Sequence, residues 1–439
     1  MAELSNYNYF INEKERIIYF NGLSKIIFSL SIEEHNTIFP LLKDLNKFQN
    51  THPKEFMNFS QWGFIVDDKK DEINQIYTRN RLEVFNNDKY KIILNPTLNC
   101  NFNCWYCFES HEDKGYMSPV TLERLKKHLD YMVVQKKIKE LEICYFGGEP
   151  LLYYKKVIEP LDQFVNILCK KYSIRLFCSF ITNGSLINMQ LIEQLQSSSY
   201  TYSFQITIDG GKEKHDQVRN MNGKPTLERI IENINLLCNE LDNVFIILRV
   251  NYDNSTLDDN SLKDVFMMIK QENRAKVTID LQRVFQTKQI NSSGIENKKL
   301  FEYYDYCKEI GFKSDLWHSL VLDRFHKCYA DLLSTTILNY DGKVYTCTAR
   351  DYTEKNCIGE LNEDGHLIYN KKYIYNKYAK PTFENNKCLN CKHLPICLGP
   401  CSQANQDCKD SNIEFICDNY LQEISFDSKI ISYYHRIHG

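Results

Sequence analysis

The sequence lacks the features of secreted, membrane and nucleic-acid-binding proteins. None of its apolar runs approaches the roughly 18 residues that a membrane-spanning helix needs. The first residues have neither a basic start nor a long apolar stretch (MAELSNYNYFINEKE), so we expect no signal peptide. The net charge of −3 provides no general basic surface for nucleic acid, although it leaves room for a local basic patch. We therefore expect a cytoplasmic protein with no membrane or nucleic-acid partner.

Cysteine, in contrast, is abundant, with 17 in 439 residues. Disulfide-rich domains are short and secreted, so a disulfide scaffold does not fit a chain of this length. Reduced thiols in a cytoplasmic protein indicate metal or redox centres. The length itself allows two or three domains.

Three of the cysteines lie close together just after the apolar run at 92–94. They are Cys100, Cys104 and Cys107. The spacing is CxxxCxxC, and Tyr106 precedes the third cysteine. Three thiolates can hold three irons of a four-iron cluster and leave the fourth iron open, whereas a cluster closed by four cysteines mainly carries electrons. An open iron can bind a small chelating ligand. A zinc knuckle or unrelated buried thiols are the alternatives.

Residues 89–300 alternate between strand and helix patterns. The predicted strands are 91–96, 141–146, 175–181, 202–208, 244–250 and 277–285. Helical periodicity follows each one, and Ser118 followed by Pro119 is a typical helix start. Six such units predict a partial barrel of parallel strands with helices outside and with functional residues after the carboxyl ends of the strands. Four cysteines within these elements are predicted to be small buried residues: Cys144, Cys169, Cys178 and Cys238.

The second predicted strand ends in a glycine pair. Gly147 and Gly148 lie about 40 residues after the cysteine group, and Glu149 follows them. Two residues without a Cβ let the backbone come close to a ligand. Their carbonyls can accept hydrogen bonds from an ammonium group, and Glu149 adds negative charge nearby.

The next strands end in polar residues. Asn183 closes the third strand and Asp209 the fourth, each directly before a glycine, which is also typical of a simple turn. Thr207 precedes Asp209 on its strand. Arg219 follows, either as a charge-assisted partner of a carboxylate or as a solvated cation. Asn251 ends the fifth strand and is a candidate contact for adenosine.

In order and spacing, the CxxxCxxC group, the Gly-Gly-Glu-Pro segment and the later strand ends resemble the radical S-adenosylmethionine (SAM) superfamily. In that family the amino and carboxylate groups of SAM chelate the open iron of a [4Fe–4S] cluster. One electron then cleaves SAM to methionine and a 5′-deoxyadenosyl radical. The resemblance implies that the first three cysteines hold this cluster. The residues that it implies around SAM are Tyr106, Gly147, Gly148, Glu149, Asn183, Thr207, Asp209 and Arg219.

A second set of cysteines lies in residues 301–439, where helical periodicity fades and the predicted strands are short. This is typical of a segment held together by metal instead of a large apolar core. A zinc ribbon would account for four of the cysteines and leave the others unexplained. The order and spacing resemble the SPASM domain, through Cys328, Gly342, Cys347, Cys388, Cys391, Cys397, Cys401 and Cys417.

The SPASM resemblance implies two auxiliary [4Fe–4S] clusters, and so three clusters in all. The ligands of the outer auxiliary cluster are Cys388, Cys391, Cys397 and Cys417. Those of the inner one, nearer to SAM, are Cys328, Cys347 and Cys401. Leu322 stands where some family members have a further cysteine. The inner cluster therefore keeps an open iron, or takes Cys357 or Cys307 as its fourth ligand; Cys408 is unassigned.

Residues 1–88 predict a small module. Two short aromatic and apolar segments flank a polar turn at 12–15, which indicates a β-hairpin. Ser31 then begins a helix with Glu34 at the capping-box spacing, and a second helix is expected near 54–61. A hairpin with small helices indicates a winged-helix-like module, or else a cap on the barrel. The module resembles the element that binds leader peptides of ribosomally made natural products.

The predicted fold is therefore α/β. It is a partial (β/α)6 TIM-like barrel, the radical SAM core, with an N-terminal winged-helix-like recognition module and a C-terminal SPASM domain rich in iron and sulfur. The expected domains are residues 1–88, 89–300 and 301–439.

The resemblance implies a radical SAM peptide maturase. Such an oxidoreductase cleaves SAM reductively, abstracts hydrogen from a precursor peptide that carries a leader, and forms an oxidised crosslink, either a thioether or a carbon–carbon bond. It takes its electron from an external donor of the flavodoxin or ferredoxin type. No residue stands out as the general base. One alternative is an anaerobic sulfatase-maturating enzyme that forms formylglycine, although that subfamily typically has Asp where this chain has Thr348. The other is a non-catalytic iron–sulfur electron-transfer protein.

Overall fold

The computed structural model describes residues 2–107, 115–196, 200–258, 260–284, 294–314, 324–410, 417 and 425–438. The chain divides into two compact units. We call Met1–Phe85, Asp315–Leu332 and Lys377–Gly439 the N-terminal unit, and Asn86–Ser314 and Leu333–Asn376 the barrel unit. The expected third domain is thus divided between the units. Its short strands join the barrel sheet, whereas Cys388 and its neighbours pack with the N-terminal region.

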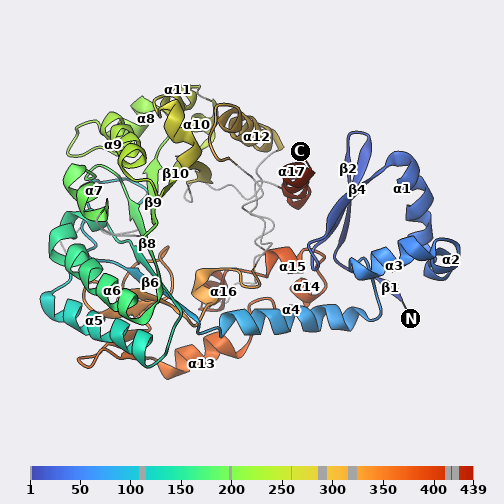
Figure 1. Ribbon diagram of the computed structural model, residues 1–439, viewed down its shortest axis with the longest axis horizontal. Helices are drawn as coiled ribbons and strands as arrows, with labels where there is room; N and C mark the ends of the chain where they lie inside the picture. Colours follow the sequence, from blue (N-terminus) through green and yellow to red (C-terminus); the bar gives the residue numbers. More distant parts are fainter. Residues whose placement is uncertain are drawn as a thin grey trace. The chain divides into compact units, whose positions relative to one another are not determined.

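The barrel unit is built around one curved sheet (Figure 1). Six parallel strands follow each other across it in chain order: β6 (Lys89–Leu94), β7 (Glu140–Tyr145), β8 (Arg175–Thr182), β9 (Tyr202–Ile208), β10 (Val244–Tyr252) and β11 (Val277–Arg283). The six predicted strands are confirmed, with bounds that differ by two residues at most; the predicted end at 285 lies outside the described residues. Beyond β6, the sheet continues with parallel β12 (Thr335–Leu338) and antiparallel β13 (Lys343–Tyr345), β14 (Gly359–Leu361) and β15 (Leu367–Tyr369).

Helices α5, α6, α7 and α9 lie on the outer side of this sheet in Figure 1. The helices of the unit are α5 (Pro119–Val134), α6 (Glu159–Tyr172), α7 (Met189–Gln196), α8 (Lys212–Val218), α9 (Leu227–Glu240), α10 (Asn254–Asp258), α11 (Ser261–Met267) and α12 (Gly294–Glu309), with the short turns η2 (Pro150–Tyr153), η3 (Tyr154–Ile158), η4 (Gln271–Lys276) and η8 (Glu354–Asn356). The predicted start of α5 is confirmed, since Ser118 Oγ accepts a hydrogen bond from Thr121 N at 3.1 Å. The cysteines predicted to be buried all lie in the core: Cys144, Cys169, Cys178 and Cys238.

The N-terminal unit contains an antiparallel sheet of order β2-β3-β4. Its elements are β2 (Asn8–Glu13), β3 (Arg16–Asn21) and β4 (Ile27–Ser31), followed by α1 (Ile32–Ile38), η1 (Phe39–Lys43), α2 (Leu45–Thr51), α3 (Pro53–Gln61) and α4 (Lys69–Val84), with β1 (Glu3–Leu4) paired to β5 (Ile65–Val66). The predicted hairpin and capping box are confirmed. Ser31 N donates to Glu34 Oε2 at 2.7 Å, and Glu34 N donates to Ser31 Oγ at 3.2 Å.

Both faces of this sheet are covered within the unit. On one face, Tyr19 packs with Phe48, Phe59 and Phe64 from the helices and the strand that follow. The other face packs against α15 (Leu394–Cys397) and α17 (Phe426–His438). The unit also contains η7 (Tyr329–Asp331), α14 (Asn386–Leu389) and α16 (Ser402–Asp410). α13 (Lys371–Ala379) crosses the boundary between the units. Among the residues described, the outer edges of β2 and β4 pair with no further strand.

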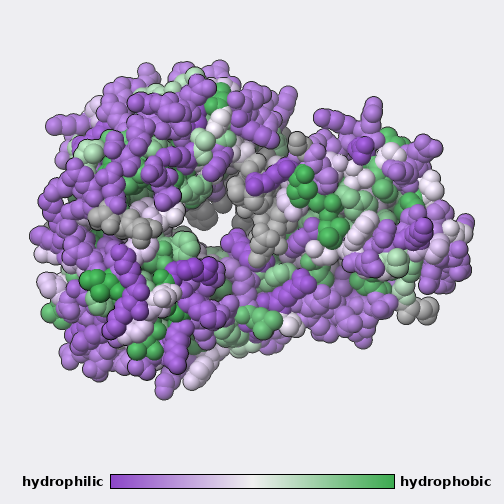
Figure 2. Space-filling model, in the orientation of Figure 1, coloured by the Kyte–Doolittle hydropathy of each residue, from purple (hydrophilic) through white to green (hydrophobic). Residues whose placement is uncertain are grey.

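The surface drawn in Figure 2 is mostly hydrophilic, with apolar atoms in small patches. Across the described ranges, no helix is long and apolar enough to span a bilayer.

Candidate active site

The glycine pair holds the loop after β7 against the loop after β6. A Cβ on Gly147 would lie 2.2 Å from Thr97 O, and one on Gly148 would lie 2.3 Å from Asn99 O. Gly148 N donates to Thr97 O at 3.2 Å, and Glu149 N donates to Asn99 O at 2.8 Å. The sequence suggested that these glycines admit a ligand. The structure shows that the space left by the missing side chains is filled by the backbone of the cysteine loop.

Glu149 is fully buried and its carboxylate is bound by protein donors. It accepts hydrogen bonds from Thr182 Oγ1 at 2.7 Å, from Asn183 N at 2.8 Å and from Leu151 N at 3.1 Å. Burial raises its pKa, while these hydrogen bonds oppose the shift. Glu149 therefore ties the loop after β7 to the end of β8, so the predicted negative charge is part of the scaffold of the site.

The thiol of Cys100 lies among donors on the barrel side of the cysteine loop. Its Sγ accepts from Phe102 N at 3.4 Å and from Asn183 Nδ2 at 3.9 Å. Burial and the negative charge of Glu149 raise the pKa of Cys100 to about 12. A buried thiol of this kind ionises when a metal ion compensates its charge. Cys104 is also buried, whereas Cys107 is exposed.

Asn183 is oriented by its neighbours. Its Oδ1 accepts from Ser185 N at 2.9 Å and from Ser185 Oγ at 2.7 Å, and its Nδ2 donates to Asn101 Oδ1 at 2.7 Å. These bonds fix the amide so that its N–H group faces Cys100. Hydrogen bonds to ligand sulfurs help to set the potential of an iron–sulfur cluster.

A second polar group lies at the ends of β9 and β10 and is centred on Tyr106. Its hydroxyl donates to the carboxylate of Asp209, with oxygen distances of 2.6 and 2.9 Å. It accepts from Arg219 Nη1 at 2.7 Å and from Asn251 Nδ2 at 3.0 Å. The structure thus brings together Tyr106, Asp209 and Arg219 of the predicted SAM residues with Asn251, the candidate contact for adenosine. Thr207 is buried on β9, and in the described residues it makes no hydrogen bond to this group.

Arg219 is a buried cation that does not use all of its N–H donors. Burial alone would lower its pKa, but Tyr106 and Asp209 outweigh that and raise it, so the guanidinium stays charged. Its Nε is buried and has no hydrogen-bond partner in the part of the chain described. A carboxylate is the natural partner of such a donor. The site thus offers three thiols from the cysteine loop and an unused N–H group, Nε of Arg219. This set fits a cluster whose open iron is chelated by an amino acid group.

His215 links Asp209 and Arg219, the two charged residues of this polar group. Asp209 N donates to His215 Nδ1 at 3.3 Å, and His215 Nε2 lies 3.2 Å from Thr226 Oγ1, which donates to the carbonyl of Arg219. Burial and Arg219 lower the pKa of His215 to about 3, so it is neutral and carries its proton on Nε2. No role could be predicted for His215 from the sequence, because its contacts arise only when the turn after β9 folds back.

The outer set of cysteines lies within the N-terminal unit. Burial raises the pKa of Cys388. Three nearby sulfur charges raise it further, those of Cys397, Cys417 and Cys391. Lys327 Nζ donates to Cys397 Sγ at 3.9 Å. In the described ranges no three Cys, His, Asp or Glu side chains are placed around a single ion. A four-iron cluster binds each thiolate to a different iron, so its ligands stand farther apart than those of one ion.

The inner set is divided between the units. Cys328 and Cys401 belong to the N-terminal unit, where Asp331 accepts from Cys328 N at 2.9 Å and from Ser402 Oγ. Cys347 and Cys357 belong to the barrel unit. Cys307 is fully buried in α12, as a core residue would be, and Leu322 lies outside the described residues.

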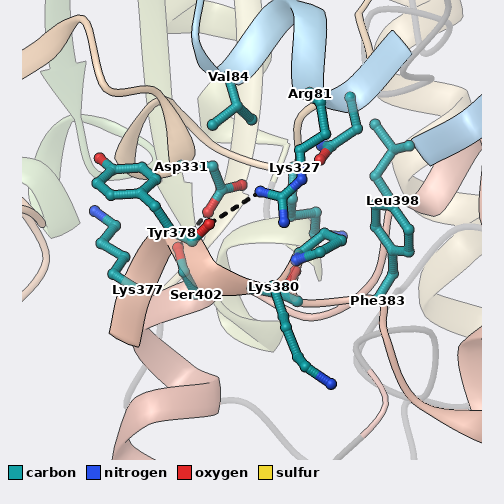
Figure 3. A pocket seen from close by; sticks show the side chains of 13 residues that line it. Arg81, Val84, Lys327, Asp331, Lys377, Tyr378, Lys380, Phe383, Leu398 and Ser402 are labelled. Atoms are coloured by element: carbon teal, nitrogen blue, oxygen red, sulfur yellow. Dashed lines mark hydrogen bonds between the residues drawn. The ribbon is translucent and has the colours of Figure 1, made fainter. Parts of the chain in front are cut away.

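Asp331 and Ser402 also line a small pocket of the N-terminal unit (Figure 3). Its volume is about 30 Å³, which is room for water and not for a substrate. Arg81 crosses it and donates to Tyr378 O at 3.1 Å and to Ala379 O at 2.8 Å. The pocket is a structural feature beside Cys328 and Cys401.

The fold and the site around Cys100 and Tyr106 define a class of protein. Residues 94–265 match the model of the Radical SAM superfamily. They include every residue from β6 to α11 that has been placed in this site, and this part of the chain is a radical SAM domain.

The chain is also similar to particular proteins. It is 25% identical to "Radical SAM cyclopropyl synthase TigE" of Paramaledivibacter caminithermalis over 419 residues, which is 87% of this chain and 84% of that protein. A structure of anSMEcpe with bound AdoMet and Kp18Cys peptide has a TM-score of 0.57 at 19% identity, covering 80% of this chain and 98% of that one. Streptococcus suis SuiB bound to the precursor peptide SuiA has a TM-score of 0.52 at 16% identity, covering 96% and 100%. The predicted fold class is confirmed.

Proposed function

We propose that this chain is a radical SAM peptide maturase that forms an oxidised crosslink, a thioether or a carbon–carbon bond, in a precursor peptide. The observation that carries the proposal is the pairing of the cysteine loop with the Tyr106, Asp209 and Arg219 group at the carboxyl ends of the strands. Two proteins similar to this chain support the proposal. TigE is described as a cyclopropyl synthase, and SuiB is described as bound to a precursor peptide.

In the SAM site, each residue has a distinct task. Cys100, Cys104 and Cys107 hold a [4Fe–4S] cluster, and Asn183 orients Cys100. Arg219 pairs with the carboxylate of SAM, and Asp209 accepts hydrogen bonds from its ribose. SAM bound there supplies a 5′-deoxyadenosyl radical, which can take hydrogen from an unactivated C–H bond.

The other cysteines hold the auxiliary clusters that accept the electron from the substrate. Removal of a hydrogen atom followed by loss of an electron and a proton oxidises the peptide by two electrons. Cys388, Cys391, Cys397 and Cys417 hold the outer auxiliary cluster. Cys328, Cys347 and Cys401 hold the inner one, with Cys357 as the candidate fourth ligand. Clusters bound there supply acceptors for that electron, and an external flavodoxin or ferredoxin supplies the electron that starts the reaction.

The N-terminal sheet is the proposed leader-binding element. Both of its faces are covered, so an extended leader adds as a strand to one of the edges, β2 or β4. Main-chain hydrogen bonds supply the affinity in that mode, and they do not require a preformed pocket.

The test is anaerobic turnover of the reconstituted full-length enzyme with the peptide encoded beside its gene. We expect 5′-deoxyadenosine and a peptide lighter by two hydrogens in mass spectrometry. Cluster binding without any deoxyadenosine would instead identify an electron carrier, and formylglycine in the product would identify the sulfatase-maturating alternative.

Arg219→Met tests the SAM site directly. Loss of a hydrogen-bonded charge costs about 1.5–3 kcal/mol, so we expect SAM to bind roughly tenfold or more weakly, with iron content unchanged. The control is Arg229→Met, which removes an exposed cation of α9. Equal SAM affinity of the two variants would remove Arg219 from the site.

A further inference from the structure

The segment that leads into β2 packs against the loop of the outer cysteines. Tyr7 and Cys388 belong to one buried cluster, together with Ile76, Phe383 and Leu394. The side chain of Tyr7 is 1% exposed. The N-terminal module therefore contributes directly to the surroundings of these cysteines, as well as presenting a sheet edge.

The hydroxyl of Tyr7 is buried and has no hydrogen-bond partner in the described part of the chain. The nearest comparable residue behaves differently, because Tyr9 Oη lies 2.7 Å from His393 Nδ1 and donates to Lys392 O at 3.2 Å. Buried hydroxyl groups are almost always bonded, so an unsatisfied one indicates a missing acceptor.

Two observations describe that acceptor. A tyrosine hydroxyl has one proton to donate, and that of Tyr7 donates it to no group in the described part of the chain. The carboxylate of Glu72 is bound by Ser5 Oγ and by Asn6 N, and it makes no hydrogen bond to Tyr7. The outer cysteines are the other acceptors here, because Cys388 lies in the same buried cluster as Tyr7.

We propose that Tyr7 donates a hydrogen bond to a sulfur atom of the outer auxiliary cluster and thereby raises the reduction potential of that cluster. The inference rests on the proposed function, because it requires four cysteines to hold a cluster at this place. A donor stabilises the reduced, more negative form of a cluster. Tyr7 is then a positioning and tuning residue, and the peptide-binding module helps to set the electron acceptor's potential.

The test compares Tyr7→Phe with Tyr9→Phe in the reconstituted full-length enzyme. Cluster potentials are measured by redox titration followed by electron paramagnetic resonance, and the outer cluster is identified by its loss in Cys391→Ala. We expect Tyr7→Phe to lower the ratio of reduced to oxidised outer cluster about threefold to tenfold at a fixed potential. That equals a shift of roughly 30–60 mV for a one-electron couple. The SAM cluster and Tyr9→Phe serve as unshifted references.

Thermal unfolding of the protein without its clusters gives a second measurement. Removal of an unsatisfied hydroxyl should leave the melting temperature of apo Tyr7→Phe unchanged or raised, while the gain in stability on cluster loading becomes smaller than in the wild type. An unshifted outer potential at full iron content, an equal shift in both variants, or a destabilised apo Tyr7→Phe would each overturn the inference. Wild-type enzyme that binds only the iron of the SAM cluster would instead overturn the proposed function first.

Discussion

At the scale of single residues, the site is a set of groups that hold each other in place. Asn183 faces Cys100 because Ser185 holds the other end of its amide, and the hydroxyl of Tyr106 bonds to both Asp209 and Arg219. The cysteines and strand-end residues could be predicted because their spacing along the chain is itself the signal. Their supports could not, since they are set by contacts between loops.

His215 has a measurable effect on the pH dependence of stability. Its pKa falls from 6.5 to about 3 on folding, so the unfolded chain binds a proton that the folded barrel does not. This contribution is full above pH 6.5 and is lost as the pH falls toward 3. One pKa unit corresponds to about 1.4 kcal/mol, so His215 alone lowers the free energy of unfolding by about 2 kcal/mol between pH 6.5 and about pH 5.

We expect His215→Gln to make the free energy of unfolding depend less on pH over that range. The measurement is urea unfolding of the apoprotein. His366→Gln, which changes an exposed histidine of the same unit, should keep the wild-type slope. Equal slopes for wild type and His215→Gln would show that His215 is not buried neutral.

At the scale of elements, the loops after β6, β7 and β8 form one interlocked surface. The glycine pair admits the cysteine loop, and Glu149 ties both to β8. The six barrel strands could be predicted because each is a run of mostly apolar residues that becomes buried in the core. β12 to β15 were not placed in the barrel, because such short strands carry little pattern and β12 pairs with β6 far away in the sequence.

Gly147→Ala tests this interlocking. The residue has φ of +103°, and its new Cβ would overlap Thr97 O. Gly223→Ala is the matched control, since Gly223 has φ of +78° and nothing within 4 Å. Both variants carry the cost of a left-handed conformation, about 1–2 kcal/mol, and only Gly147→Ala adds an overpacking cost of about 1–3 kcal/mol. We expect iron of the SAM cluster to be lost only in Gly147→Ala; iron retained in both would mean that the two loops adjust independently.

At the scale of the whole molecule, the two compact units do not follow the three predicted domains. The sequence indicates a hairpin and a cysteine-rich tail, and nothing local shows that one covers the other. That packing follows from apolar faces that match only in three dimensions, such as Phe20 of β3 with Phe426 and Ile430 of α17.

Ile430→Ala measures how much α17 contributes to the N-terminal unit. Ile430 is fully buried, so its truncation should cost about 2–5 kcal/mol and lower the iron held by the outer cysteines. Ile437→Ala, on the same helix but 50% exposed, should cost less than about 0.5 kcal/mol. The readouts are chemical unfolding and iron content, and deoxyadenosine formation by the barrel should persist in both. Similar losses in the two variants would show that α17 does not cover the sheet.

The hydrogen bond between Ser29 of β4 and Tyr434 of α17 joins positions 405 residues apart. During synthesis on the ribosome, the hairpin emerges before the barrel strands, and the helix that covers it emerges after them. The nascent chain therefore completes its barrel while one apolar side of the hairpin is still exposed. Under the proposed function, iron delivered before α17 emerges would meet an incomplete outer site.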